Sequence, residues 1–119
     1  MKVILDEGVP KQLASNLPGH SVTTVQDQGW ASVKNGKLLA LIAENRFEAF
    51  LSCDRNLEFQ QTLGHRPFAI LLLSTNHWPS MKPHIGKITD ELDASEPGTV
   101  RQVTCGIFQK RRRPFAPSV

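Results

Sequence analysis

Short apolar runs alternate with amphipathic segments along the chain. Runs rich in apolar or β-branched residues predict strands at residues 2–5, 20–25, 48–53, 68–73 and 100–105. Between them we expect helices at residues 10–17, 37–44 and 81–92. This alternation predicts a three-layer α/β fold, in which right-handed crossovers join a mainly parallel sheet of four to five strands.

Local signals mark the ends of these predicted helices. Pro10 suits the first turn of a helix, and Pro18-Gly19 would end that helix. Asn35 is expected to cap the second helix, because its side chain can accept a hydrogen bond from an amide of the first turn. The third helix is predicted from a continuous apolar face, formed by Met81, Ile85, Ile88 and Leu92.

Length and charge predict one domain and a separate tail. A chain of 119 residues can bury one hydrophobic core, and we expect that domain at residues 1–108. From residue 109 the sequence is rich in arginine and proline, which predicts a basic, disordered tail at 109–119. This tail holds four of the 14 basic residues, so ten remain against 11 acidic residues. A body with a charge of about −1 is not a basic platform for nucleic acid.

Composition argues against several classes of protein. No apolar run approaches the roughly 20 residues of a membrane-spanning helix, so we expect no membrane partner. Acids at positions 6 and 7 interrupt any signal-peptide pattern. The 2 cysteines are too few for a disulfide framework or a zinc site, and the 4 histidines lack metal-ligand spacing. A reduced, cytoplasmic protein is the expectation.

Two of the predicted strands end in acidic residues. Leu5 is followed by Asp6 and Glu7, and the strand at 48–53 is followed by Asp54. Ligands of parallel sheets bind outside the carboxyl ends of the strands, so Asp6 and Asp54 would meet there if their strands are neighbours. Their charges would need a cation, and Mg²⁺ is often held by only one or two carboxylates. The alternative is that each acid only caps a turn or a helix.

An ordered set of short motifs runs through the chain from Leu5 to Gln61. The motifs are Leu5-Asp6-Glu7-Gly8-Val9-Pro10, Gly19-His20 with Val22 and Val25, Gly29-Trp30, Asn35-Gly36 with Leu38-Leu39, and Ser52-Cys53-Asp54-Arg55-Asn56-Leu57 with Gln60-Gln61. Together they resemble the small bacterial PIN-like proteins, relatives of PIN-domain ribonuclease toxins, over about residues 1–105. The resemblance implies a Rossmann-like sheet, a Mg²⁺- or Mn²⁺-dependent RNA endonuclease and a small antitoxin protein as partner.

The resemblance also implies roles for particular residues. By motif match, Asp6 is the first metal-binding acid and Asp54 the later one, with Glu7 as a third candidate ligand. Many relatives have acids where this chain has Asn35 and Asn56, so these amides would support catalysis without adding charge. The site would then be poorer in charge than one built from carboxylates alone. Weaker metal affinity, or loss of hydrolysis, is therefore a second hypothesis.

Neighbours of these residues are candidates for contact with RNA. Arg55 could contact a phosphate or form a local ion pair, and Gln60 could hydrogen-bond RNA or face water. Lys34 and Lys37 could guide RNA, although solvated lysines are the commoner case. Trp30 could stack on a base, but in a loop between strand and helix it more often packs over a core edge.

Three functions are compatible with the sequence. The first is a metal-dependent ribonuclease, as the toxin of a toxin–antitoxin pair, and the second is a PIN-like module that binds RNA or protein without cleaving. A second copy of the chain is a further candidate partner. The third function is a receiver domain of a signalling system, which would use Asp6, Glu7, Asp54, Ser74 or Thr75, and Lys87. That assignment fits poorly, because Lys87 falls inside a predicted helix instead of at a strand end.

Overall fold

The structure of the protein, a computed structural model, describes residues 1–54 and 66–105. In this part of the chain the strands are β1 Lys2–Leu5, β2 Ser21–Thr24, β3 Ala49–Ser52, β4 Ala69–Leu73 and β5 Val100–Val103. The helices are α1 Asn35–Glu44, α2 Trp78–Met81 and α3 Ile85–Asp93, with 3-10 helices at Lys11–Asn16 and Lys82–His84. All five predicted strands are present, each shorter than or equal to its predicted span.

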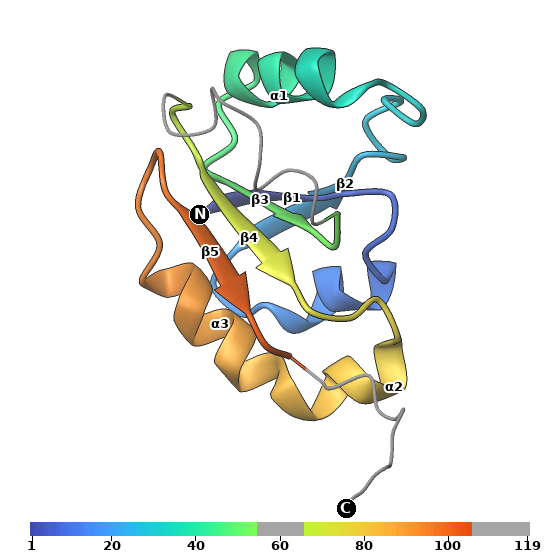
Figure 1. Ribbon diagram of the computed structural model, residues 1–119, viewed down its shortest axis with the longest axis vertical. Helices are drawn as coiled ribbons and strands as arrows, with labels where there is room; N and C mark the ends of the chain where they lie inside the picture. Colours follow the sequence, from blue (N-terminus) through green and yellow to red (C-terminus); the bar gives the residue numbers. More distant parts are fainter. Residues whose placement is uncertain (55–65, 106–119) are drawn as a thin grey trace, which may run out of the picture.

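The strands form one parallel sheet in the order β2-β1-β3-β4-β5. Helix α1 covers one face, and α2 and α3 cover the other (Figure 1). The prediction of a three-layer α/β fold is therefore confirmed. From β1 the chain winds first to β2 on one side and then to β3 on the other. In sheets of this order, the crevice for ligands lies where the winding reverses, between the carboxyl ends of β1 and β3.

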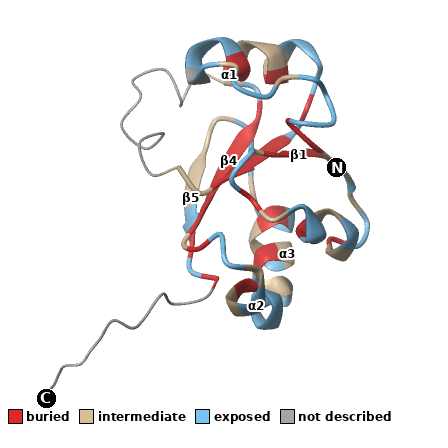
Figure 2. Ribbon diagram, turned by 90° about the vertical axis from the view of Figure 1, so that its right-hand side faces the viewer, coloured by how far each residue is buried: buried red, intermediate tan, exposed pale blue. Residues whose placement is uncertain are grey.

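Each face of the sheet packs into its own hydrophobic core. On the α1 side, Phe50 of β3 lies between its sheet neighbours Ile4 and Ile70, and all three are fully buried. On the α3 side, Leu51 and Leu71 belong to the second core. Successive side chains of a strand point to opposite faces, so the uninterrupted apolar strands are buried on both sides (Figure 2).

The prediction of one continuous helix over residues 81–92 is wrong. Helix α2 ends at Met81, a 3-10 turn follows, and α3 begins at Ile85. Pro83 lies in that turn, and proline lacks the N–H that an α-helix interior requires while its ring clashes with the preceding turn. The apolar face continues across the break through its buried members, Met81, Ile88 and Leu92.

Two helix starts also differ from the prediction. The segment after Pro10 is a 3-10 helix that buries Leu13, a form typical of short helical pieces. Helix α1 already includes Asn35, and Lys34 occupies the capping position in an extended conformation without a side-chain hydrogen bond. The prediction that Asn35 caps this helix is therefore wrong by one position.

Other local predictions concern Trp30 and the membrane. Trp30 packs edge-on against Phe47, with ring centroids 6.2 Å apart and planes at 81°, so packing over the core edge is confirmed. Within residues 1–54 and 66–105, no helix is both long and apolar enough to span a bilayer.

Candidate functional site at the carboxyl edge of the sheet

Asp6 and Asp54 follow two strands that are neighbours in the sheet. Asp6 comes directly after β1, and Asp54 lies two residues after the end of β3. These strands pair in parallel with Leu5 beside Leu51, and the Asp6 N–H extends the pairing by donating to the Leu51 carbonyl at 2.9 Å. Both acids are partly buried. The two carboxylates therefore stand at the same edge, on either side of the point where the winding reverses.

Ser52 connects the two acids. Its hydroxyl donates to Asp6 Oδ2 at 2.7 Å and accepts the N–H of Asp54 at 3.0 Å. Ser52 is 0% exposed, so this hydroxyl depends on its protein partners for hydrogen bonds. It fixes the orientation of the Asp6 carboxylate and holds the backbone of Asp54 beside it. Ser52 belongs to one of the sequence motifs, but the sequence assigned it no role, although a hydroxyl at the end of an otherwise apolar strand was the available signal.

Glu7 anchors a loop beside Asp6. The Glu7 N–H donates to Asp6 Oδ1 at 2.8 Å, while Glu7 Oε1 accepts the N–H of Ser32 at 2.9 Å. Gln26 Nε2 also donates to the Glu7 carbonyl at 3.3 Å. One oxygen of this exposed carboxylate is therefore occupied by a hydrogen bond to the loop between β2 and α1. A carboxylate offers about four lone-pair positions, so each Asp6 oxygen keeps room for a further partner.

That loop leads to Lys34, Asn35 and Lys37 at the start of α1. Strand β2 ends at the same edge as β1, and α1 follows the loop that begins there. Lys34 and Lys37 are exposed, and no side chain caps the helix at Lys34. The first N–H groups of a helix and its dipole favour a negative group nearby. The start of α1 therefore brings positive charge to the sheet edge that carries the acids.

A hollow of about 290 Å³ lies at the same carboxyl edge of the sheet as the acids. It is lined by Cys53, Ser74, Thr75 and Asn76, which follow the paired strands β3 and β4. The Cys53 thiol donates to the Thr75 carbonyl at 3.3 Å, and Thr75 Oγ1 accepts the N–H of His77 at 3.1 Å. These bonds fix the side of the hollow that lies nearest to Ser52 and Asp54.

Cys53 is a neutral thiol at physiological pH. Burial, and next to it the nearby groups of Cys105 and Asp6, raise the pKa of the Cys53 thiol from 9.0 to about 12. Since the thiolate and not the thiol is the nucleophile, Cys53 is not suited to nucleophilic catalysis.

We expect the buried thiol to make folding stability fall at alkaline pH. Between 9.0 and about 12 the unfolded chain releases the Cys53 proton while the folded chain keeps it. The unfolded state then binds fewer protons, so the free energy of unfolding decreases as pH rises through this window. Urea unfolding at about pH 8 and about pH 10 should show a larger loss for the natural chain than for Cys53→Ala. Equal losses in the two proteins would contradict the assignment.

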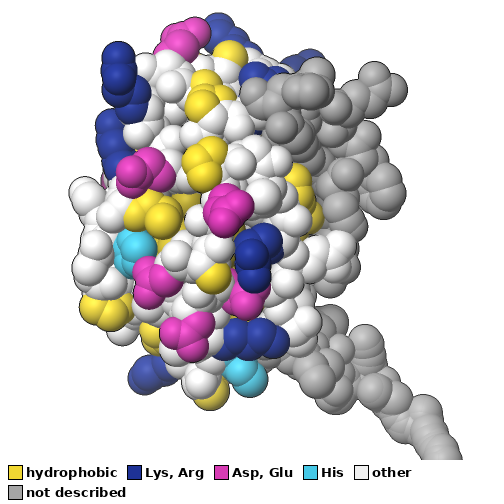
Figure 3. Space-filling view, turned by 90° about the vertical axis from the view of Figure 1, so that its left-hand side faces the viewer, with side chains coloured by type: hydrophobic (Ala, Val, Ile, Leu, Met, Phe, Trp, Pro, Cys, Tyr) yellow, Lys and Arg dark blue, Asp and Glu magenta, His cyan; other side chains and the backbone are white. Residues whose placement is uncertain are grey.

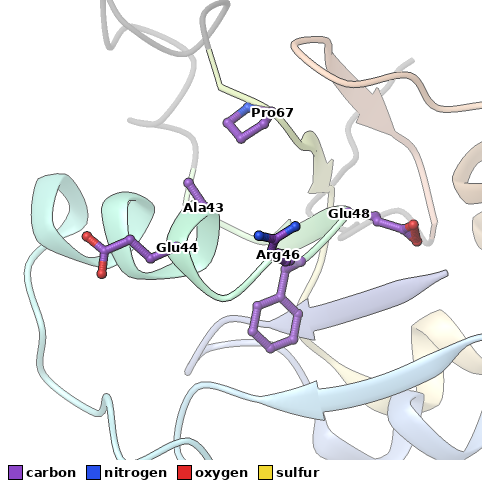
Figure 4. Close-up of a pocket in the computed structure, with 6 residues that line it drawn as sticks. Ala43, Glu44, Arg46, Glu48 and Pro67 are labelled. Carbon is purple, nitrogen blue, oxygen red and sulfur yellow. The ribbon is translucent and has the colours of Figure 1, made fainter.

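A second hollow lies at the opposite edge of the sheet. It has a volume of about 390 Å³ and is lined by Ala43, Glu44, Arg46, Phe47, Glu48 and Pro67 (Figure 4). Arg46 follows α1 in the left-handed conformation, with φ 61°, and Lys2 Nζ lies 4.5 Å from the centroid of the Phe47 ring. Because cations and carboxylates are mixed here, the lining favours no single charge on a ligand. This hollow lies at the amino ends of β3 and β4, away from the acids.

Asp6 and Asp54 are the described residues best placed to hold a cation. Among residues 1–54 and 66–105, no group of three or more His, Cys, Asp or Glu side chains is arranged as a metal site. Two carboxylates nevertheless fit Mg²⁺, which keeps several of its own waters. The other motif-derived candidates, Arg55, Asn56 and Gln60, lie outside the described residues, as does the predicted tail at 109–119.

Comparison of the chain with protein-family models, with curated proteins and with solved structures gives no significant match. The likeness to PIN-like proteins therefore rests on the sequence motifs alone.

Proposed function

We propose that the protein is a metal-dependent PIN-like endoribonuclease. The observation that carries the proposal is the position of Asp6 and Asp54 at the ends of neighbouring strands, where Ser52 joins them through two hydrogen bonds. Acids that only cap turns would not need a buried hydroxyl shared between two strand ends. The arrangement lies at the crevice where sheets of this order bind ligands.

The donor set of the site suits Mg²⁺ or Mn²⁺. Asp6 and Asp54 would hold the cation, with Asn35 and Asn56 in supporting roles and Glu7 engaged with the loop. When bound, the cation would supply Lewis acidity and an activated water for phosphodiester hydrolysis. Ser52 and the Glu7 N–H orient the Asp6 carboxylate, so the chain itself contributes a fixed ligand geometry.

Positive groups that could offset the charge of RNA lie at the carboxyl edge. Lys34 and Lys37 are exposed there, beside the N–H groups of the first turn of α1. The face near β5, on the left of Figure 1, carries interspersed acidic and basic side chains over its described residues (Figure 3). On the β5–α3 side, Arg101 Nε pairs with Glu91 Oε1 at 3.0 Å. The start of α1 is therefore the better entry for RNA.

The proposed biological role is that of a toxin paired with a small antitoxin protein. The role follows from the likeness to PIN-like proteins, and a homodimer is a further candidate assembly. Co-expression with the product of an adjacent small reading frame should restore the growth of cells that the protein alone inhibits. Growth that is equally poor with and without that product would argue against the pairing.

A cleavage assay tests the enzymatic proposal directly. The purified protein should cut single-stranded RNA in the presence of Mg²⁺ or Mn²⁺ and stop cutting when a chelator is added. A parallel calorimetric titration with Mn²⁺ should show binding to the protein. If a panel of RNAs stays intact and the titration shows no binding, the nuclease proposal fails.

We expect Ser52→Ala to weaken metal binding and cleavage together. Loss of the hydroxyl frees the Asp6 carboxylate and leaves the Asp54 N–H without this acceptor. Removing such an outer-shell partner lowers metal affinity or activity by about 10- to 100-fold. Ser95→Ala is the matched control, because the Ser95 hydroxyl donates to the Leu92 carbonyl at 2.7 Å, at the far end of α3. Mn²⁺ titration and kcat/KM should change for the first variant and stay constant for the second.

A receiver domain is the second candidate function. The observation that favours it is the strand order, which receiver domains share. The position of Lys87 argues against it, since a receiver needs its lysine at the end of a strand and Lys87 lies exposed within α3. The residues that follow the last strand, β5, are instead Thr104 and Cys105. Incubation with acetyl phosphate should therefore leave Asp54 unmodified, and a stable phosphoprotein would favour the receiver. RNA binding without cleavage would instead favour the non-catalytic module.

A further inference from the structure

Over its described residues, the hollow at the carboxyl ends of β3 and β4 is lined by polar side chains without an acidic or basic group. Cys53, Ser74, Thr75 and Asn76 include no lysine, arginine, histidine or carboxylate. A phosphate in this hollow would meet no cation among these four described residues, and it would lie at the same edge of the sheet as Asp6 and Asp54. A neutral group that forms hydrogen bonds avoids this repulsion. The lining therefore favours a nucleobase over a phosphate.

Asn76 is the side chain of the lining that can read a base. It is exposed, and within residues 1–54 and 66–105 its carboxamide makes no hydrogen bond. A carboxamide presents one acceptor oxygen and two N–H donors. Bases in single-stranded RNA present donors and acceptors side by side on their edges, and proteins read these edges through hydrogen bonds. Thr75, in contrast, already uses its carbonyl and hydroxyl within the protein.

The hollow is close enough to the acids to receive a base from the RNA strand whose phosphate would lie at Asp6 and Asp54. Strand β4 is next to β3, which is next to β1, and neighbouring strands are about 4.8 Å apart. The hollow therefore begins within about 10 Å of Asp6 by strand spacing. Cys53, which forms part of its wall, stands between Ser52 and Asp54 in the chain.

We propose that this hollow binds the base of the nucleotide beside the scissile phosphate, and that Asn76 hydrogen-bonds the edge of that base. The assignment rests on the proposed ribonuclease function and adds a specificity-determining residue to it. Asn76 makes this contact with substrate, while Cys53 and Thr75 form the fixed wall against which the base lies.

Steady-state cleavage of short single-stranded oligonucleotides tests the role of Asn76. Asn76→Ala should raise KM by about 3- to 10-fold, the effect of one or two hydrogen bonds, with a smaller change in kcat. Asn76→Asp should shift base preference toward guanine, because a carboxylate only accepts and guanine presents two adjacent N–H donors. The exposed Gln12, in the 3-10 helix Lys11–Asn16, provides the control variant Gln12→Ala. Unchanged KM and base preference in both Asn76 variants would overturn the assignment.

Binding of free nucleosides separates this assignment from the nuclease proposal. Adenosine, cytidine, uridine and guanosine are titrated into the isotope-labelled Asp6→Asn variant, and the side-chain amide signal of Asn76 is followed by NMR. A saturable shift with at least one nucleoside supports the base site even if no RNA is cleaved. If all four leave the Asn76 signal unchanged, the base site is rejected, whether or not the natural chain cleaves RNA.

Discussion

Replacing Asp6 by Asn should abolish metal-dependent RNA cleavage, with a loss in kcat/KM of more than about 100-fold. Removing a residue that only orients a metal ligand already lowers metal affinity or activity by about 10- to 100-fold. Asp6 would itself be a ligand, so we expect a larger loss. Asparagine has nearly the same shape, and its carbonyl oxygen can accept only one of the two bonds that now come from Ser52 and the Glu7 N–H. The variant removes the charge that a divalent cation requires while keeping most of the local packing.

Control measurements separate this loss of charge from a loss of fold. Asp90→Asn makes the same chemical change at an exposed position of α3 and should retain full activity. Circular dichroism should show the same secondary structure in both variants, and Mn²⁺ titration should show weakened binding only for Asp6→Asn. Cleavage at the natural rate by a folded Asp6→Asn protein would remove Asp6 from the catalytic site.

Much of the fold could be predicted because the strands are apolar and short. The run from Phe68 to Leu73 predicts β4, and the register then places Ile70 next to Phe50. What the sequence does not contain is the order of the strands. Asp6 and Asp54 lie at one candidate site only because β1 and β3 pair, and this adjacency depends on long-range packing rather than on local pattern.

The errors in the helices have local causes. The apolar periodicity runs from Met81 to Leu92 without a break, so it predicts one helix. Pro83 interrupts that helix, but the 3-10 turn that contains it preserves the buried face. Asn35 is a favourable capping residue, but the capping position is one residue earlier, at Lys34, and Asn35 is the first residue of the helix. Propensity and periodicity therefore located both helices and gave one wrong boundary in each.

The candidate site was only partly visible in the sequence. Carboxylates at strand ends are a sequence signal for ligand chemistry, so Asp6 and Asp54 could be predicted as candidates. Ser52 and Asn76 have no distinctive spacing, and the roles proposed for them depend on partners from other strands and on the hollow at the carboxyl ends of β3 and β4. Glu7 is similar, because its contact with Ser32 depends on the path of a loop. Polar residues of this kind require coordinates before a role can be argued.

Packing beneath the acids sets their spacing. Phe50 stands two residues before Ser52 on β3, and its sheet neighbour Ile4 stands two residues before Asp6 on β1. Both side chains are 0% exposed and pack in the core under α1. The contact between Phe50 and Ile4 therefore lies one step along the same face from the hydrogen bonds by which Ser52 holds Asp6 and Asp54. Stability and site geometry are coupled through this position.

Phe50→Ala should be among the most destabilising single substitutions in the chain, at about 3–5 kcal/mol. The change removes a fully buried ring and leaves a cavity between Ile4, Ile70 and α1. Since domains are typically stable by about 5–15 kcal/mol, this loss would consume a large part of the total. Urea unfolding measures it, with Phe50→Leu as the control that keeps most of the volume and should lose less than about half as much.

The same pair of variants links the core to the acids. Phe50→Leu should stay folded and keep Mn²⁺ binding close to that of the natural chain, because β1 and β3 remain paired. Phe50→Ala should lose Mn²⁺ affinity even at temperatures where it is folded, since the cavity loosens the strands that hold Asp6 and Asp54. A destabilisation below about 1 kcal/mol in Phe50→Ala would mean that this ring does not support the junction between β1 and β3.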